Sequence, residues 1–261
     1  MKSLPFLSAA LAFALCLPIM SQSPDPGSLL FLREQRDVAI GNRVEQWRLE
    51  WVSQPSEICR PNDESEEWLT CPCHGFAFGE EGDLDLVRIF RGKEIERLRL
   101  NPFFAQESDW LPESDGKAVL QRWPVLKQDY DIETRSTAEF GVMVRQRPLC
   151  KIMTLGDYDH DGQATEFVLQ VTAGPCGHRP SIVIGISKGN MHLHAFASLE
   201  KPGEPLVLEG PSDWEKVRSA KGKVDVLLYG CGDHGGDYEM SLSVWFTKQG
   251  IHAVEQGHDC K

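Results

Sequence analysis

Apolar and polar residues alternate along much of the chain, which is typical of β-strands that bury one face. In residues 42–52 (NRVEQWRLEWV), four apolar side chains lie nearly on alternate positions. Residues 83–90 and 94–100 repeat this pattern on either side of a Gly-Lys turn at 92–93, and together they predict a β-hairpin. This part of the chain is therefore expected to form antiparallel strands.

The second half of the chain contains a series of similar segments separated by short turns. The predicted strands are residues 141–155, 166–173, 181–187, 191–198, 205–209, 224–230, 238–246 and 251–255. Residues 212–220 instead predict a helix, which Ser212 caps with Glu215 three residues later. Residues 114–123 are a candidate for a second short helix.

Helices do not alternate with the predicted strands, as they would in a parallel sheet. We therefore predict an all-β fold of mainly antiparallel hairpins with one or two short helices. The hairpins are expected to form a β-sandwich or a small propeller-like arrangement.

The N-terminal residues have a different character. Lys2 is followed by an uncharged apolar run from Leu4 to Met20 and a small polar tail, which is typical of a secretory signal peptide. A membrane anchor is the alternative, but Pro18 interrupts the run and no cluster of positive charges precedes it. The sequence therefore predicts a signal peptide over residues 1–22 and a secreted or periplasmic protein.

The rest of the chain is expected to contain one domain. Residues 23–41 form a linker and N-terminal segment that begins with Ser, Pro, Asp and Gly, and residues 42–261 form a single mainly-β domain. No second apolar run is long enough to span a bilayer. Stable membrane insertion after removal of the signal is therefore not expected.

The charge of the chain limits its expected partners. The formal net charge is −12, from 39 acidic and 27 basic residues. Binding to a phosphate backbone depends on the release of its counterions by cationic side chains, so neither nucleic acid nor an anionic membrane is an expected partner. Exposed Trp residues such as Trp68, Trp110 and Trp214 can stack on sugars. The expected partner is a protein or a glycan at the cell envelope.

Seven of the eight cysteines follow the signal peptide, and export favours disulfides for them. Pairing of near neighbours predicts bridges between Cys150 and Cys176 and between Cys231 and Cys260. Cys59 is expected to pair with Cys71 or Cys73, which leaves one thiol over.

Residues 156–171 (GDYDHDGQATEFVLQV) contain the most specific motif of the chain. In a tight loop, the side chains of Asp157, Asp159 and Asp161 converge on one centre, and Gly162 allows the backbone to turn. The carbonyl of Gln163 supplies a further oxygen. Carboxylates within about 5 Å repel one another by about 1 kcal/mol or more per pair, so the motif predicts a bound cation, and Ca²⁺ fits such an all-oxygen shell.

This loop resembles the calcium loops of integrin-type FG-GAP repeats and of the related bacterial VCBS repeats. In these loops D-x-D-x-D-G precedes an acidic residue and then a β-strand, as Glu166 and residues 167–169 follow here. An EF-hand is less similar, because its twelfth position requires a Glu and Val168 stands there. The resemblance implies a bacterial source and Glu166 as a further ligand of Ca²⁺. Because the acidic residue usually stands at the ninth position, Thr165 or water is the alternative to Glu166.

The surroundings of the loop favour a structural role for the ion. Cys150 and Cys176 lie on either side of it, and a disulfide between them would contribute about 3.5 kcal/mol of loop-closure entropy. Ion and bridge would then hold the same hairpin. No nucleophile is present within the loop.

Residues 229–239 (YGCGDHGGDYE) are the best candidate for an active site. A hydrolase or thiol enzyme centred on Cys231, Asp233 and His234 is the alternative to a binding protein, with His234 lowering the pKa of the thiol. Asp237 and Glu239 are nearby, and His74 or His258 are further candidates. Since export favours a Cys231–Cys260 bridge, we expect binding or scaffolding and not catalysis.

Overall fold

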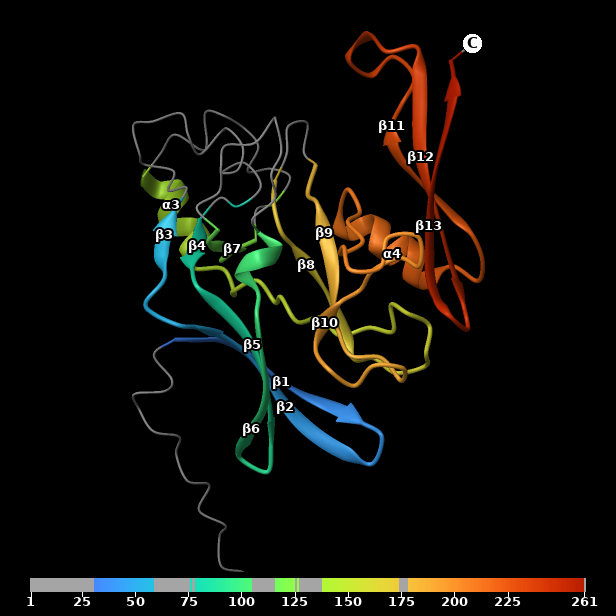
Figure 1. The fold of residues 1–261 in the computed structure, drawn as a ribbon. Helices are drawn as coiled ribbons and strands as arrows, with labels where there is room; N and C mark the ends of the chain where they lie inside the picture. The colour runs from blue at the N-terminus through green and yellow to red at the C-terminus, as the bar shows by residue number, and fades with distance from the viewer. Residues whose placement is uncertain are drawn as a thin grey trace, which may run out of the picture. The chain divides into compact units, whose positions relative to one another are not determined.

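The computed structural model describes residues 31–58, 76, 78–104, 116–124, 126, 138–173 and 178–260. Within these ranges the chain forms mostly antiparallel strands in four small sheets, with two short α-helices (Figure 1). This confirms the predicted all-β fold. None of the described helices is long and apolar enough to cross a membrane. The predicted signal peptide lies outside the described residues.

The first sheet contains the predicted hairpin and has the strand order β1-β2-β5-β6. Its strands are β1 (Leu32–Ile40), β2 (Arg43–Trp51), β5 (Leu84–Phe90) and β6 (Lys93–Arg99). Alternate residues of β2 are buried, among them Trp47, Leu49 and Trp51, so the period-two pattern is correct there. The β structure begins at Leu32, within the segment that the sequence assigned to the linker and N-terminal segment.

A second sheet has the order β3-β4-β7 and consists of β3 (Ser56–Ile58), β4 (Gly79–Gly82) and β7 (Ala118–Gln121). The expected short helix over residues 114–123 is wrong, because β7 is an extended strand that pairs with β4. Ala118 and Leu120 are buried while the residues between and after them are half-buried. A strand places such alternate residues on one face.

The expected strand over residues 141–155 is also wrong, because residues 141–145 belong to helix α3 (Ala138–Arg145) and residues 146–155 form no strand. Phe140 and Val144 are buried four residues apart, whereas Val142 is exposed, which is the spacing of a helix face. These two side chains form a small core cluster with Phe78 and Trp123. The packing partners therefore come from distant parts of the chain.

The third sheet lies between two hydrophobic clusters and has the order β10-β9-β8. Its strands are β8 (Glu166–Gln170), β9 (Ser181–Gly185) and β10 (His194–Ala195). Phe167 and Ile184 pack with the inner face of the first sheet, while Val183 packs on the other side with Trp214 and Val244. The segment 205–209 contributes only isolated bridges and no strand.

The fourth sheet has the order β11-β12-β13, from β11 (Val224–Tyr229), β12 (Tyr238–Thr247) and β13 (Gly250–Asp259). All three strands were predicted, although β13 continues four residues past the predicted end at residue 255, and a short turn joins β12 to β13. Helix α4 (Pro211–Ser219) also agrees with the prediction, except that Gly210 and not Ser212 is its cap. Pro211 occupies the first turn, where its missing N–H costs nothing.

Trp214 does not contact solvent. Its side chain is fully buried, and its indole N–H donates to the carbonyl of Ser181 at 2.9 Å. The expectation that Trp214 stacks on sugars is therefore wrong, because the apolar face of α4 requires it in the core. Trp68 and Trp110 lie outside the described residues.

A buried arginine joins the first sheet to the segment before β10. The guanidinium of Arg88 in β5 bonds both carboxylate oxygens of Glu45, at 2.7 and 3.0 Å, and one oxygen of Glu96 at 2.5 Å. It also donates to the carbonyl of Met191 at 2.6 Å, and Glu96 accepts the N–H of Leu193 at 2.9 Å. Burial raises the pKa of Glu45, but Arg88, together with Trp47 and Arg43, lowers it by more, so the pKa lies below its ordinary value.

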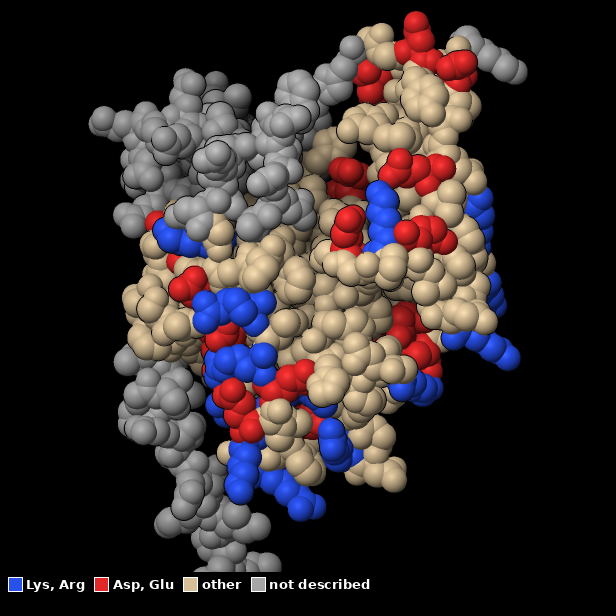
Figure 2. Space-filling view, viewed as in Figure 1, with Lys and Arg blue, Asp and Glu red and all other residues tan. Residues whose placement is uncertain are grey.

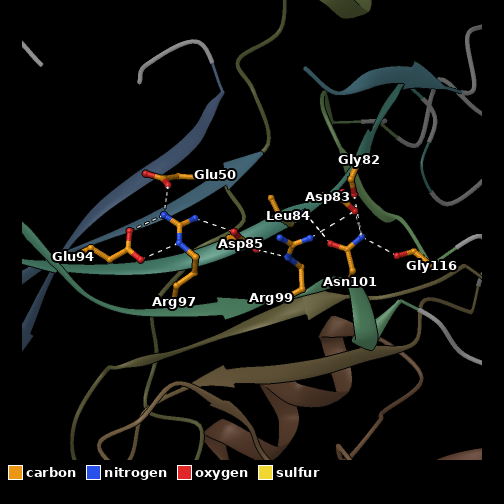
Figure 3. A network of polar contacts seen from close by, with 10 residues as sticks. All are labelled: Glu50, Gly82, Asp83, Leu84, Asp85, Glu94, Arg97, Arg99, Asn101 and Gly116. Atoms are coloured by element: carbon orange, nitrogen blue, oxygen red, sulfur yellow. Dashed lines mark hydrogen bonds and ion pairs between the residues drawn. The ribbon is translucent and has the colours of Figure 1, made fainter. Parts of the chain in front are cut away.

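The opposite face of the same sheet carries a second network of charges (Figure 3). Asp85, which is almost fully buried, accepts hydrogen bonds from Arg97 at 2.8 Å and from Arg99 at 2.5 Å. Asn101 accepts the N–H of Leu84 and donates to the carboxylate of Asp83. Each buried carboxylate of this sheet is therefore paired with an arginine.

Glu200 fastens a loop to the last strand. Its carboxylate lies 2.7 Å from Nδ1 of His252 and accepts the N–H of Ala253 at 2.8 Å. These hydrogen bonds lower the pKa of Glu200 to about 2.

We expect replacement of Glu45 by Ala to lower the free energy of unfolding by about 3 kcal/mol, because it removes one counter-charge of a buried guanidinium. Urea denaturation measures the loss. Glu94→Ala is the control, since Glu94 and Arg97 are both largely exposed and their pair is worth less than about 1 kcal/mol. Equal losses in the two variants would contradict the assigned role of Arg88.

The Glu200 contact predicts a pH-dependent stability. Because the folded pKa is lowered from 4.5 to about 2, the stabilisation is complete above the unfolded value and is lost as the pH falls from 4.5 to 2. Wild type is therefore expected to melt above Glu200→Gln at pH 5, and the difference is expected to disappear towards pH 2. A difference between the two melting temperatures that stays constant from pH 5 to pH 2 would contradict the lowered pKa of Glu200.

Candidate metal centre

The D-x-D-x-D-G motif forms a closed loop immediately before β8. Gly156 and Glu166 exchange backbone hydrogen bonds of 2.8 and 3.2 Å, which join the two ends of the loop. Gly162 has a φ of +87°, a value that favours glycine, so it makes the turn that the motif predicts. His160 also adopts a positive φ of 61°.

Three carboxylates of the loop come together. One oxygen from each of Asp157, Asp159 and Glu166 lies within 4.8 Å of the others. Glu166 is fully buried, and its two oxygens accept the N–H of Tyr158 at 2.8 Å and the hydroxyl of Thr165 at 2.6 Å. The side chain displaced by one position from the FG-GAP pattern therefore belongs to the cluster.

The other predicted ligands are placed differently. Asp161 lies outside the group of three, because its carboxylate accepts the N–H of Gln163 at 2.8 Å and of Lys188 at 2.6 Å. Gln163 thus uses its N–H to hold Asp161. Thr165, the alternative to Glu166, is buried and its hydroxyl lies 3.0 Å from the carbonyl of Ile186.

The three carboxylates have no cationic partner among the described residues. The ammonium of Lys188 bonds the backbone carbonyl of Asp161 and forms no ion pair with a carboxylate of the group. Oδ1 of Asp157 is buried and has no hydrogen-bond partner. A buried, unpaired carboxylate oxygen is costly unless a ligand completes its shell.

The electrostatics of the loop reflect this lack of positive charge. Burial and the charges of Asp159 and Asp161 raise the pKa of Glu166 to about 8, although the hydrogen bonds from Thr165 and Tyr158 oppose the shift. Burial likewise raises the pKa of Asp159 to about 6, and the neighbouring Asp161 and Asp157 add to the shift. The fold thus holds acidic groups together in a place where their charged forms are unfavourable.

The donor set fits a hard cation. Carboxylate and carbonyl oxygens are the ligands that Ca²⁺ prefers, and they do not select soft metals, which require sulfur or imidazole. Asp157, Asp159 and Glu166 are the residues that would hold the ion. A cation there would supply the counter-charge that the side chains lack.

Gly185 is a residue of the site that the sequence analysis did not identify. It lies opposite Glu166 in the pairing of β8 with β9. A Cβ atom at this position would lie 2.8 Å from Cα of Glu166 and closer still to the carbonyl oxygen of Thr165. A glycine at the end of an otherwise apolar strand is consistent with such a close backbone approach.

The structure also tests the cysteine predictions in part. Cys231 and Cys260 form the predicted disulfide, and Asp233 accepts the N–H of Gly230 at 2.7 Å. The thiol-enzyme interpretation is therefore wrong for Cys231, because a disulfide carries no nucleophilic thiolate. Glu239 pairs with His258 at 3.4 Å. His74 and the side chain of His234 lie outside the described parts.

The predicted bridge at Cys150 is not formed, since Cys150 has a free thiol and burial raises its pKa. Its backbone is held elsewhere: the N–H donates to the carbonyl of Arg122, and the carbonyl accepts from Arg33. The expected partner Cys176 lies outside the described residues, as do Cys59, Cys71 and Cys73. The loop is therefore held by its hydrogen bonds without a flanking disulfide at Cys150.

Comparison with known proteins gave no match among protein-family models, curated proteins or solved structures. The resemblance to FG-GAP and VCBS loops therefore rests on the loop itself.

Replacement of Gly185 by Ala is expected to lower the free energy of unfolding by about 1–3 kcal/mol, because the added methyl group pushes β8 away from β9. Gly222→Ala is the matched control, since a Cβ there meets no atom within 4 Å, and its effect should stay within about 0.5 kcal/mol. Chemical denaturation of both variants measures the contrast. Similar stabilities would show that the two strands tolerate a wider separation.

Proposed function

We propose that this chain is an exported β protein whose loop at residues 157–166 binds a structural Ca²⁺ ion, and whose role is binding or scaffolding at the cell envelope. The ligands are Asp157, Asp159 and Glu166. Asp161 contributes by fixing the loop through the N–H groups of Gln163 and Lys188.

A single observation carries the calcium proposal. Among the described residues, Glu166 is the one buried carboxylate without an ion pair, whereas the other buried acids all have one. Their partners are Arg43 and Arg88 for Glu45, Arg33 and Arg122 for Glu80, Arg97 and Arg99 for Asp85, and Lys216 for Asp213. A fold that neutralises every other buried acid is expected to neutralise this one with an ion.

The position of the loop supports a structural role. Glu166 begins β8, a strand that packs between the two main clusters of the core. An ion at this strand end joins the loop to the centre of the fold. Because the ion binds only the folded loop, its binding free energy is expected to add to the stability of the whole domain.

Two features support export and a non-catalytic role. The Cys231–Cys260 disulfide is typical of proteins outside the reducing cytoplasm. The same bridge removes Cys231 as a nucleophile, and the acidic composition disfavours nucleic acid as a partner.

The calcium proposal predicts a melting temperature that rises with Ca²⁺ concentration. Linkage gives about 2.7 kcal/mol of added stability at a hundredfold excess over the dissociation constant. Scanning calorimetry with Ca²⁺ and with a chelator measures this difference. Mg²⁺ at the same concentration is expected to have a smaller effect, since it requires stricter octahedral geometry.

Asp159→Asn is the informative variant, because it removes one charge from the cluster. It is expected to lose the Ca²⁺ response and, in chelator, to melt at or above the wild type, since the repulsion is relieved. Asp37→Asn is the control, as Asp37 is exposed in β1 and the substitution is chemically identical. A wild type that melts identically in Ca²⁺ and in chelator would falsify the proposal.

A further inference from the structure

The C-terminal sheet continues past the part of it that packs on the core. Val226, Leu242, Val244 and Ile251, near its base, belong to the cluster around α4. Beyond them the same sheet face is exposed, and Figure 1 shows the end of β13 projecting beyond α4. The cross-strand partners there are Tyr229 with Met240 and Tyr238 with Asp259.

The projecting end presents aromatic side chains to solvent. Tyr229 is 55% exposed and Tyr238 is 50% exposed. Gly257 has no side chain, and the ring of Tyr238 lies over its Cα, where a Cβ would collide with the phenol oxygen. The Cys231–Cys260 disulfide and the hydrogen bond from the N–H of Cys260 to the carbonyl of Asp237 close this end. The surface is thus held in shape before any partner binds.

Strand β13 forms one edge of this sheet, and only part of that edge forms hydrogen bonds with the rest of the chain. The carbonyl of Ile251 accepts the N–H of Leu199, and the N–H of Ala253 donates to Glu200, so odd-numbered residues of β13 direct their backbone groups outward. By the same alternation the groups of Glu255, Gly257 and Asp259 point outward. Among the described residues, no hydrogen-bond partner reaches these three sets of backbone groups, although the side chain of Glu255 pairs with Lys201. The segment at Ser198 already forms a parallel bridge to this edge.

The charge along this sheet is predominantly acidic, although Glu255 forms an exposed ion pair with Lys201 at 3.7 Å. Between Val224 and Cys260 the chain has six acidic residues and a single Lys or Arg, which is Lys248 in the turn at the opposite end of β12. Glu255 lies opposite Leu242, and Asp225 lies opposite Ser243 near the base, where it pairs with Lys223 at 3.9 Å. The other acidic residues, Asp233, Asp237, Glu239 and Asp259, lie at the projecting end. Figure 2 shows acidic and no basic side chains at this end of the face that it draws. A partner of opposite charge is the one this surface attracts.

We propose that the free part of β13, Glu255–Asp259, is a docking edge for an extended cationic segment of another protein, which adds a strand to the sheet. Backbone pairing with the three outward residues supplies affinity, as in other strand additions. The side chains of Glu255 and Asp259 lie on the same face, four residues apart. The partner strand is therefore expected to carry two basic residues at the same spacing, with the position between them facing Gly257 and Tyr238.

A second copy of the chain fits the edge less well. Antiparallel pairing of β13 with itself about Gly257 would place Glu255 opposite Asp259 twice, and like charges directly opposite are destabilising. The acidic edge thus disfavours self-association and favours a cationic partner.

The proposal names the partner class for the binding role proposed above, but it does not depend on the calcium site. The probe is an acetylated nine-residue peptide of Thr and Val with Lys at its third and seventh positions, titrated by fluorescence anisotropy at low ionic strength. We expect saturable binding to the full chain, with the same affinity in Ca²⁺ and in chelator. Asp159→Asn should bind it equally well.

Two controls separate strand pairing from simple charge attraction. A peptide of the same charge, in which the backbone amides that would face β13 are N-methylated, should bind at least tenfold more weakly than the unmodified peptide. A peptide with Glu in place of Lys should also bind at least tenfold more weakly. On the protein side, Glu255→Lys and Asp259→Lys should each weaken binding severalfold and together at least tenfold. Asp37→Lys makes the same charge change on exposed β1 and should leave the affinity within about twofold of wild type.

Several results would overturn the proposal. One is that the N-methylated peptide binds with the same affinity as the unmodified one. Another is that the Glu255→Lys and Asp259→Lys double variant keeps the wild-type affinity for the peptide while circular dichroism shows that it is folded. A dimer in sedimentation velocity that the double variant abolishes would assign the edge to a second copy. Glycan binding at this end that both substitutions leave intact would assign it to a sugar. Loss of peptide binding with an intact Ca²⁺ response, or the reverse, identifies which proposal fails.

Discussion

Neutralisation of buried charge is the constraint on which this fold depends. Arg88 lies inside an apolar strand and connects the first sheet to the segment before β10, through Glu45, Glu96 and the carbonyl of Met191. Its removal would leave Glu45 buried without its main partner, and the contact between the sheet and this segment would lose the hydrogen bond to Met191 and keep the one from Leu193 to Glu96. The strands around it can pack closely because opposite charges meet where water is excluded.

The loop before β8 meets the same constraint in a different way. Glu166 is as deeply buried as Glu45, yet its partners are a backbone N–H and a hydroxyl instead of a guanidinium. Neutral hydrogen bonds hold the carboxylate in place without cancelling its charge, so its pKa rises where that of Glu45 falls. The difference between these two residues is the reason to expect a cation in one place and not in the other.

Much of the fold follows from local patterns, and the exceptions have physical causes. The strands 224–229 and 238–247 and the helix α4 were predictable because their periodicity matches their own buried faces. Helix α3 was not, because its apolar residues also fit a strand and only contacts with Phe78 and Trp123 decide between the two. Similarly, the motif predicted the loop and its Gly turn, but the N–H of Lys188, distant in sequence, draws Asp161 away.

In the C-terminal sheet, β13 continues beyond the residues that pack on the core, so the outer part of its edge is exposed. Near Ile251 and Ala253 the edge is satisfied by Leu199 and Glu200 of the same chain. Beyond that point the acidic side chains of Glu255 and Asp259 protect the exposed backbone from pairing with another copy. The protection is selective, because a negative edge repels a negative strand and attracts a positive one. An edge whose charge disfavours self-association is thereby suited to a partner of the opposite charge.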